Sequence, residues 1–155
     1  MIVRRKTHWQ WVFSCATAVY HTIAPTRGKI VPTEFLAGAR PEMWMSDRYA
    51  AQTDHGALHQ VCLAHLIRDA QYAIDAVDAV FAPLFKSFLA EVCELARQRP
   101  ELTDRALRAH ARNMDRRLAV LLDLKTSNTK GNHLRASINV DWRDNLAPRY
   151  FTWVA

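Results

Sequence analysis

Glycine and proline are scarce in this chain, with four and six among 155 residues. Their scarcity excludes low-complexity sequence and long disordered segments. Long apolar runs are missing too, because none approaches the roughly 20 residues that a helix needs to cross a bilayer. After a basic start, residues 7–11 are too polar for the apolar region of a signal peptide. We therefore expect a cytoplasmic protein with no membrane partner.

Cysteine is also rare. Cys15, Cys62 and Cys93 are odd in number and far apart, which argues against a disulfide framework. We expect three reduced, mostly buried thiols. The pattern His59-x-x-Cys62-x-x-His65 offers too few ligands for structural zinc, which normally takes four, with thiolates prominent. The glycine spacings of phosphate-binding loops and nucleophile elbows are absent as well.

The charge is unevenly distributed along the chain. At 155 residues the chain is long enough for one domain with a core. The net charge is +6. Residues 97–149 contain twelve Lys and Arg against six Asp and Glu, so this half accounts for the whole surplus. A basic half indicates an anionic partner, usually nucleic acid. A solvated basic helix without a partner is the alternative.

The N-terminal part is predicted to form strands. Residues 8–15 place Trp9, Trp11 and Phe13 on one face of a period-2 pattern, and residues 18–24 continue as the second strand of an antiparallel hairpin. A short helix is predicted over 31–37, ending at Gly38. Short strands are predicted over 43–45 and 60–63, with parallel pairing through crossovers. The tryptophans, Trp44 included, are interpreted as core residues and not as platforms for base stacking.

The remainder, from Ala64 on, is predicted to be helical. Pro83 fits a first helical turn, residues 84–96 form a strongly amphipathic helix, and Pro100 breaks it. A further apolar stripe runs from 107 to 121. Residues 127–131 are predicted to be a loop, residues 132–145 a weaker helix and residues 148–155 an irregular tail. Four arginines occupy the face opposite the 107–121 stripe: Arg105, Arg108, Arg112 and Arg116.

Asp47 is the first candidate for chemistry. It follows a short predicted strand, and the carboxyl ends of strands are where α/β sheets usually place ligands. Phosphoryl transfer on DNA commonly uses two divalent metals clamped by several carboxylates, and Mg²⁺ prefers oxygen ligands. One carboxylate in a basic chain is compatible with the nucleus of such a site. The alternative is that Ser46 and Asp47 cap the turn that follows.

Several collinear segments resemble the catalytic domain of the insertion-sequence-66 family of DDE-type bacterial transposases. The resemblance covers residues 7–146. It rests on segments 9–13, 23–28 and 34–38 and on two longer motifs, Ser46-Asp47-Arg48-Tyr49-Ala50-Ala51 and Cys62-Leu63-Ala64-His65-Leu66-Ile67-Arg68-Asp69. It implies an RNase H-like fold, a triad of acids that binds Mg²⁺, and DNA cleavage and strand transfer during transposition of a mobile element.

The resemblance carries one catalytic and metal-binding acid onto this chain, Asp47. The family's first acid precedes the segment that begins at Trp9, and its third follows the helical region. Neither has a counterpart here, so the chain is predicted to be truncated at both ends. Substitution by nearby acids is not expected, because two-metal sites need preset geometry. Residues proposed to contact DNA phosphates are Arg48, His65, Arg68, Arg105, Arg108, Arg112 and Arg116.

The predicted fold is therefore α/β, an incomplete RNase H-like mixed sheet over 1–80 followed by a helical extension over 81–147. The leading hypothesis is a transposase fragment that is inactive alone, with DNA as partner and homo-oligomerisation left open. A second hypothesis is a non-catalytic DNA-binding module or regulator derived from a transposase. A third is a decayed gene product, which predicts a broad, non-cooperative thermal melt.

Overall fold

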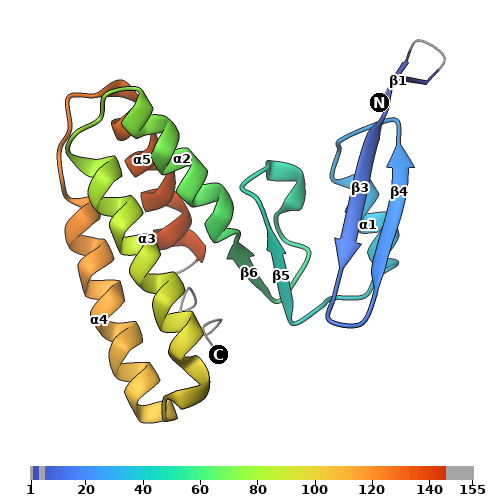
Figure 1. Cartoon of the computed structure of the whole chain (residues 1–155). Coiled ribbons are helices and arrows are strands. Elements are labelled where there is room, and N and C mark those ends of the chain that lie inside the picture. Colours follow the sequence, from blue (N-terminus) through green and yellow to red (C-terminus); the bar gives the residue numbers. More distant parts are fainter. Residues whose placement is uncertain (1, 4–5, 146–155) are drawn as a thin grey trace. The chain divides into compact units, whose positions relative to one another are not determined.

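The structure is a computed structural model that describes residues 2–3 and 6–145, with side chains described for residues 7–139. The predicted tail over 148–155 lies outside the described residues. The chain divides into two compact units, Met1–His59 and Gln60–Ala155, and each unit is described by itself. Figure 1 shows the strands of the first unit and the long helices of the second.

The predicted hairpin is confirmed. Strands β3 (Trp9–Ser14) and β4 (Val19–Ala24) pair antiparallel, and the turn is closed by a 2.9 Å hydrogen bond from the backbone N–H of Cys15 to the carbonyl oxygen of Ala18. Two shorter strands, β1 (Ile2–Val3) and β2 (Lys6–Thr7), form a separate antiparallel pair. Because side chains alternate along a strand, the hairpin has one inward and one outward face.

The inward face of the hairpin carries the core of the first unit. Trp11 and Phe13 are buried there, and Trp9 packs against them, which confirms these tryptophans as core residues. The indole N–H of Trp11 is satisfied by the carbonyl oxygen of Thr26 at 3.1 Å. The helix α1 (Ile30–Leu36) covers this face, and its Phe35 ring stacks on Phe13 with centroids 3.9 Å apart.

The helix α1 ends where the sequence predicts. Ala37 has a left-handed backbone with φ 48°, and Gly38 follows with φ 87°. A positive φ is unfavourable for most residues but not for glycine, so Gly38 adopts its conformation without strain, whereas Ala37 at the C-cap holds a less favourable one. The chain then forms β5 (Met43–Ser46), the short 3₁₀ helix η1 (Ala50–Gln52) and β6 (Leu58–Val61).

Strands β5 and β6 form a two-stranded sheet of their own. The hydrogen bonds that lead into it run from Ala57 N to Pro41 O and from Leu58 N to Glu42 O, each 2.9 Å. Both bonds join the residues that lead into the two strands, and the parallel pairing stays a prediction. The prediction of the last strand over 60–63 was displaced by two residues, because Cys62 already caps the following helix.

An α/β composition is confirmed, but the predicted single mixed sheet is not formed by the described residues. Their strands make three separate two-stranded sheets, each joining neighbours in the sequence, for which closure costs least entropy. Trp44 of β5 still packs against the hairpin core. The sheets of the first unit therefore share apolar contacts without sharing a hydrogen-bond ladder, and the RNase H-like arrangement stays a prediction.

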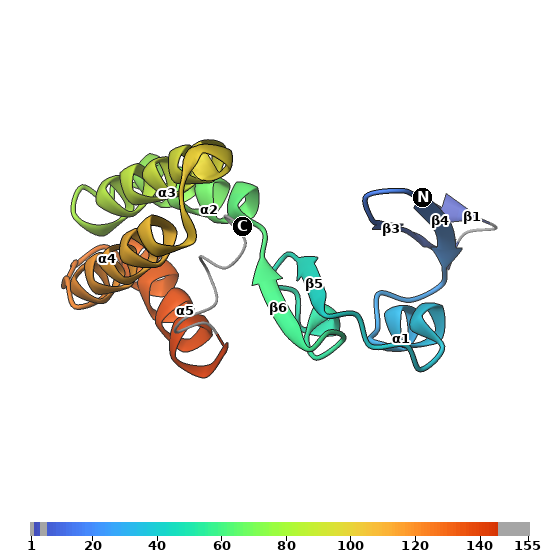
Figure 2. The ribbon, with the colours of Figure 1, turned by 90° about the horizontal axis from the view of Figure 1, so that it is seen from below.

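The second unit is a bundle of four helices: α2 (Leu63–Asp75), α3 (Phe81–Gln98), α4 (Asp104–Leu122) and α5 (Thr129–Asn145). Figure 2 shows these helices from below, with α3 and α4 side by side as in Figure 1. The predicted apolar stripes form one core. Its most buried large side chains are Leu66, Phe81, Phe85 and Ile138.

Helix ends in this unit follow local chemistry. Pro83 lies in the first turn of α3, as predicted, and Pro100 lies in the short 3₁₀ helix η2 (Arg99–Glu101) that ends it. The hydroxyl of Thr103 caps α4 by accepting from Ala106 N at 3.2 Å. Of the helices between residues 2 and 145, none combines the length and the apolar character that crossing a membrane requires.

The start of α5 differs from the prediction. The side-chain oxygen of Asn128 accepts from Lys130 N at 2.9 Å and from Gly131 N at 3.0 Å, so the helix begins at Thr129 and not at 132. Asparagine is a preferred N-cap because its side chain satisfies these otherwise unpaired N–H groups. The predicted loop over 127–131 is correspondingly shorter.

Candidate nucleic-acid interface and the Asp47 turn

Asp47 immediately follows β5 and is half-buried. Its carboxylate oxygen Oδ1 accepts a 3.1 Å hydrogen bond from the backbone N–H of Tyr49, which is a local turn typical of aspartate. The structure therefore confirms the alternative prediction that Asp47 caps the turn that follows. Capping fixes the direction of the Asp47 side chain at the end of the strand.

Ser46 and His59 support this turn from the two paired strands. The hydroxyl of Ser46 donates to the carbonyl oxygen of Asp47 at 2.8 Å and lies 2.8 Å from Nε2 of His59. A hydroxyl has one hydrogen to give, so Nε2 of His59 is the donor in the second bond. The Ser46 oxygen is thus an acceptor from histidine, an arrangement that positions the turn and does not activate a nucleophile.

Two cations of the segment before α1 lie in the same unit and were not among the predicted site residues. The guanidinium of Arg27 lies 4.5 Å from the centroid of the Tyr49 ring, a cation–π geometry. Lys29 forms a 3.0 Å ion pair with Asp54, and the hydrogen bond and charge of Lys29 lower the pKa of the Asp54 carboxyl. The sequence signal for a cation such as Arg27 was Tyr49, two positions after Asp47, because an aromatic ring attracts a guanidinium group.

The residues around Asp47 do not amount to a complete Mg²⁺ site. Asp47 supplies one carboxylate, and its neighbours Ser46 and His59 bond to each other. In the part of the chain that the structure describes, no three His, Cys, Asp or Glu side chains are grouped so as to hold a metal. Mg²⁺ needs near-octahedral oxygen coordination, so Asp47 could supply only one ligand of such a site.

Other acids near Asp47 in the sequence have structural contacts. Asp54 pairs with Lys29, and Asp75 accepts a 2.6 Å hydrogen bond from Gln71. Asp78 is 2% exposed and accepts from Ala82 N at 2.8 Å in the first turn of α3. These contacts give each carboxylate a local partner in the fold.

The predicted phosphate-contacting residues are divided between the two units. Arg48 belongs to the first unit, as does the predicted metal ligand Asp47, and His65 and Arg68 lie on α2 in the second. Arg68 is exposed, whereas His65 is half-buried with an Nδ1 atom that has no hydrogen-bond partner among residues 7–139. Within the second unit, Arg68 is the more accessible to an anionic ligand.

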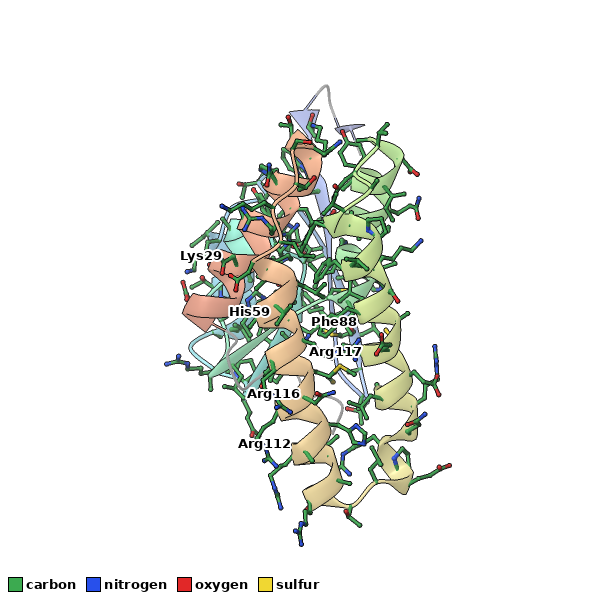
Figure 3. All side chains as sticks on the ribbon, turned by 90° about the vertical axis from the view of Figure 1, so that its left-hand side faces the viewer. Lys29, His59, Phe88, Arg112, Arg116 and Arg117 are labelled. Atoms are coloured by element: carbon green, nitrogen blue, oxygen red, sulfur yellow. The ribbon has the colours of Figure 1, made fainter. Side chains whose placement is uncertain are left out.

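The arginine row on α4 has the geometry that the sequence predicts. Arg105, Arg108, Arg112 and Arg116 are all exposed, and Figure 3 shows Arg112 and Arg116 on successive turns of the helix. With a rise of about 1.5 Å per residue the row extends over about 16 Å. The opposite face of α4 is buried through Leu107, Met114 and Leu118. The helix therefore presents a basic face that the bundle core holds in place.

The three cysteines are free thiols, as predicted. The expectation that they are mostly buried was wrong, because Cys15 is exposed and Cys62 and Cys93 are half-buried. Cys15 lies in the hairpin turn after β3, where the solvent-facing geometry of a tight turn overrides the usual burial of cysteine.

Among known protein families, the chain matches the transposase IS66 family over residues 2–140. The chain belongs to the IS66 family of transposases. This confirms the resemblance drawn from the Asp47 and His65 motifs and makes the protein transposase-derived, with DNA as the partner that the family implies. Comparisons with curated proteins and with solved structures give no match.

Proposed function

We propose that this IS66-family chain takes part in transposition by holding the DNA backbone along α4, as part of the machinery for DNA cleavage and strand transfer. The observation that carries the proposal is the exposed row of four arginines on a helix whose other face is buried. Arg48, His65 and Arg68 are assigned as further phosphate contacts. Membership of the IS66 transposase family supports DNA as the partner.

The arginine row is suited to phosphates and not to base edges. A row about 16 Å long at 1.5 Å per residue spans about five phosphates of one strand, which are 3.4 Å apart along the duplex axis. Guanidinium groups bind phosphate oxygens in a bidentate manner but read no sequence from the backbone. The expected binding is therefore salt-dependent and sequence-independent.

The test is duplex DNA affinity measured by fluorescence anisotropy over a range of salt concentrations. Each arginine that contacts phosphate should contribute about 0.9 to the slope of log K against log salt, so replacing all four with alanine should reduce the slope by about 3.6. The matched control is Lys125→Ala, which removes an exposed charge outside α4. An unchanged slope in the fourfold variant would refute the proposal.

The second part of the proposal concerns Asp47. We assign it as the metal-binding acid that the IS66 family places after this strand, and we propose that the 155-residue chain does not cleave DNA by itself. Two-metal phosphoryl transfer needs several carboxylates in preset positions, and Asp47 is the one acid here that matches the family pattern. Mg²⁺-dependent nicking of a duplex that disappears in Asp47→Ala but persists in Asp54→Ala would overturn this part.

A non-catalytic DNA-binding module is the second candidate. It is favoured because one acid, Asp47, matches the family's catalytic pattern, whereas the basic face of α4 is extended. It predicts the same salt-dependent DNA affinity with no effect of Asp47→Ala. If DNA affinity in the presence of Mg²⁺ falls at least tenfold in Asp47→Ala, while the thermal melt is unchanged, the metal-binding assignment is favoured over the non-catalytic module.

A further inference from the structure

A groove runs between α3 and α4 on the surface of the helical unit. It has a volume of about 490 Å³. Its walls come from successive turns of both helices: Leu84, Ser87, Phe88, Glu91, Asn113, Arg116, Arg117, Val120 and Leu121. Figure 3 shows three of these side chains, Phe88, Arg116 and Arg117.

The groove has apolar side chains on both walls. Leu84 is 51% exposed on α3 and Val120 is 66% exposed on α4, with Phe88 buried between the helices. Exposed large apolar side chains that line the same groove are typical of an interaction surface. Burying them against a partner would remove apolar area from water, which is favourable.

One polar pair is built into the groove and is already neutralised. Arg117 donates two hydrogen bonds to Glu91, at 2.6 and 2.8 Å, and its guanidinium lies 5.8 Å from the centroid of the Phe88 ring. The hydrogen bonds from Arg117 lower the pKa of the Glu91 carboxyl, so this carboxylate stays charged and paired. It offers little to a further cation.

The rim on the α4 side has unbalanced positive charge. Arg116 lines the groove, and Arg112 lies one turn earlier on the same helix. Neither makes an ion pair with any residue whose side chain the structure describes. The spacing of four residues separates the two by about 6 Å along the helix axis, which is the spacing of two carboxylates at positions i and i+4 of another helix.

We infer that this groove binds an amphipathic helix of a partner protein, whose apolar stripe lies on Leu84, Phe88 and Val120. Two carboxylates on the flank of that helix would pair with Arg112 and Arg116. Helix-in-groove recognition uses apolar anchors at i, i+3 or i+4 and i+7, and the exposed apolar side chains of the two walls provide matching positions. The inference goes beyond DNA binding, because an apolar floor contributes nothing to phosphate recognition.

A second copy of this chain is a poorer occupant. Two copies meeting groove to groove would bring Arg112 and Arg116 toward their own counterparts, and each copy has a net charge of +6. Such like-charge contact opposes self-association. Charge complementarity therefore favours an acidic partner.

The experiment uses the full chain and two designed 18-residue amphipathic peptides. Both have the same leucine stripe; one has glutamate and the other lysine at the two flanking positions, and binding is followed by fluorescence anisotropy near 0.15 M salt, where screening acts over about 8 Å. We expect the glutamate peptide to bind at least tenfold more tightly. In the double variant Arg112→Glu/Arg116→Glu the preference should reverse.

Two controls separate the groove from general charge. The double variant Arg105→Glu/Arg108→Glu makes the same charge change outside the groove lining and should retain the preference for the glutamate peptide. Leu84→Ser/Val120→Ser changes no charge and should weaken both peptides at least tenfold while leaving duplex DNA affinity unaltered. Because both replaced side chains are exposed, an unchanged thermal melt is expected to accompany that loss.

Four results would overturn the inference. Equal affinity for the two peptides would remove the charge argument. Unchanged peptide binding in Leu84→Ser/Val120→Ser would place the peptide elsewhere. Self-association in sedimentation that this variant abolishes would assign the groove to a second copy, and loss of duplex DNA binding in the same variant would assign it to DNA.

Discussion

Replacing Gly131 with alanine should destabilise the helical unit, although glycine-to-alanine changes inside helices normally stabilise by up to about 1 kcal/mol. A Cβ atom at this position would clash with Oδ2 of Asp78 and would lie 2.9 Å from Oδ1. Real Cβ atoms do not approach oxygen so closely. The Asp78 carboxylate or the start of α5 would have to move.

The Asp78 carboxylate is poorly placed to move. It is buried, and it accepts from Ala82 N at 2.8 Å, from the hydroxyl of Thr126 at 2.8 Å and from Val80 N at 3.3 Å. Hydrogen bonds to a charged group are worth about 1.5–3 kcal/mol each. Losing two of the three and gaining the usual alanine advantage gives a net destabilisation of about 2–5 kcal/mol.

The assay is urea unfolding followed by helical circular dichroism, for Gly131→Ala, Asp78→Ala and the double variant. If the clash is the cause, Gly131→Ala should be harmful in the wild-type background and neutral or stabilising once the carboxylate is gone. Ala136→Gly, at an exposed position of the same helix, is the control and should cost about 1 kcal/mol. A stabilising effect of Gly131→Ala in the wild-type background would refute the reasoning.

Three further predictions concern single groups. Burial raises the pKa of the Asp78 carboxyl, but its hydrogen bonds outweigh burial and the pKa is lowered overall. Its contribution to the free energy of unfolding should therefore be complete above the unfolded pKa of about 3.9 and be lost as pH falls through the folded value. Urea unfolding as a function of pH measures this, and a dependence that vanishes in Asp78→Asn confirms the source. Glu91→Gln should cost only about 0.5 kcal/mol in the same assay, because the pair with Arg117 is 45% and 42% exposed and surface ion pairs contribute little; a loss of several kcal/mol would contradict this. Cys15 should react with iodoacetamide before the other two thiols, since it is exposed and hydrogen bonds from Thr17 and Ala18 lower the pKa of its thiol. Peptide mapping after brief labelling measures the order, and preferential labelling of either other cysteine would count against it.

Local patterns explain which parts of the fold could be predicted from the sequence. The alternation at Trp9, Trp11 and Phe13 and the stripe through Leu107, Met114 and Leu118 depend on residues a few positions apart, and both faces are buried as expected. Whether these neighbouring pairs join into one sheet depends instead on pairing between distant segments. The residues of β3 and β5 do not specify which strand, if any, pairs with the remaining edge of each strand.

Helix boundaries were harder because they depend on single side chains. The start of α5 was placed late, although Asn128 is a recognisable N-cap residue. Gly131 favoured the prediction of a loop, and the cap at Asn128 was missed for this reason. In the structure, glycine is needed at 131 because the backbone of α5 lies very close to Asp78, and not because the chain turns there. A glycine is thus ambiguous in the sequence until its neighbours in space are known.

The acids show a similar ambiguity. Asp47, Asp54 and Asp78 are all carboxylates within a short stretch of sequence, and composition does not separate them. The structure does so by partners: an ion pair with Lys29 for Asp54, a buried helix start for Asp78 and a local turn for Asp47. The family motif independently selects Asp47.

Capping and metal binding are not exclusive roles for Asp47. The cap uses one hydrogen bond, from Tyr49 N to Oδ1, whereas an ionised carboxylate has about four lone-pair sites. Ser46 and His59 hold the same turn from two paired strands, so the side chain has a defined direction before any ligand arrives. Phosphoryl transfer requires carboxylates in preset positions, and a capped turn at a strand end is an economical way to preset one.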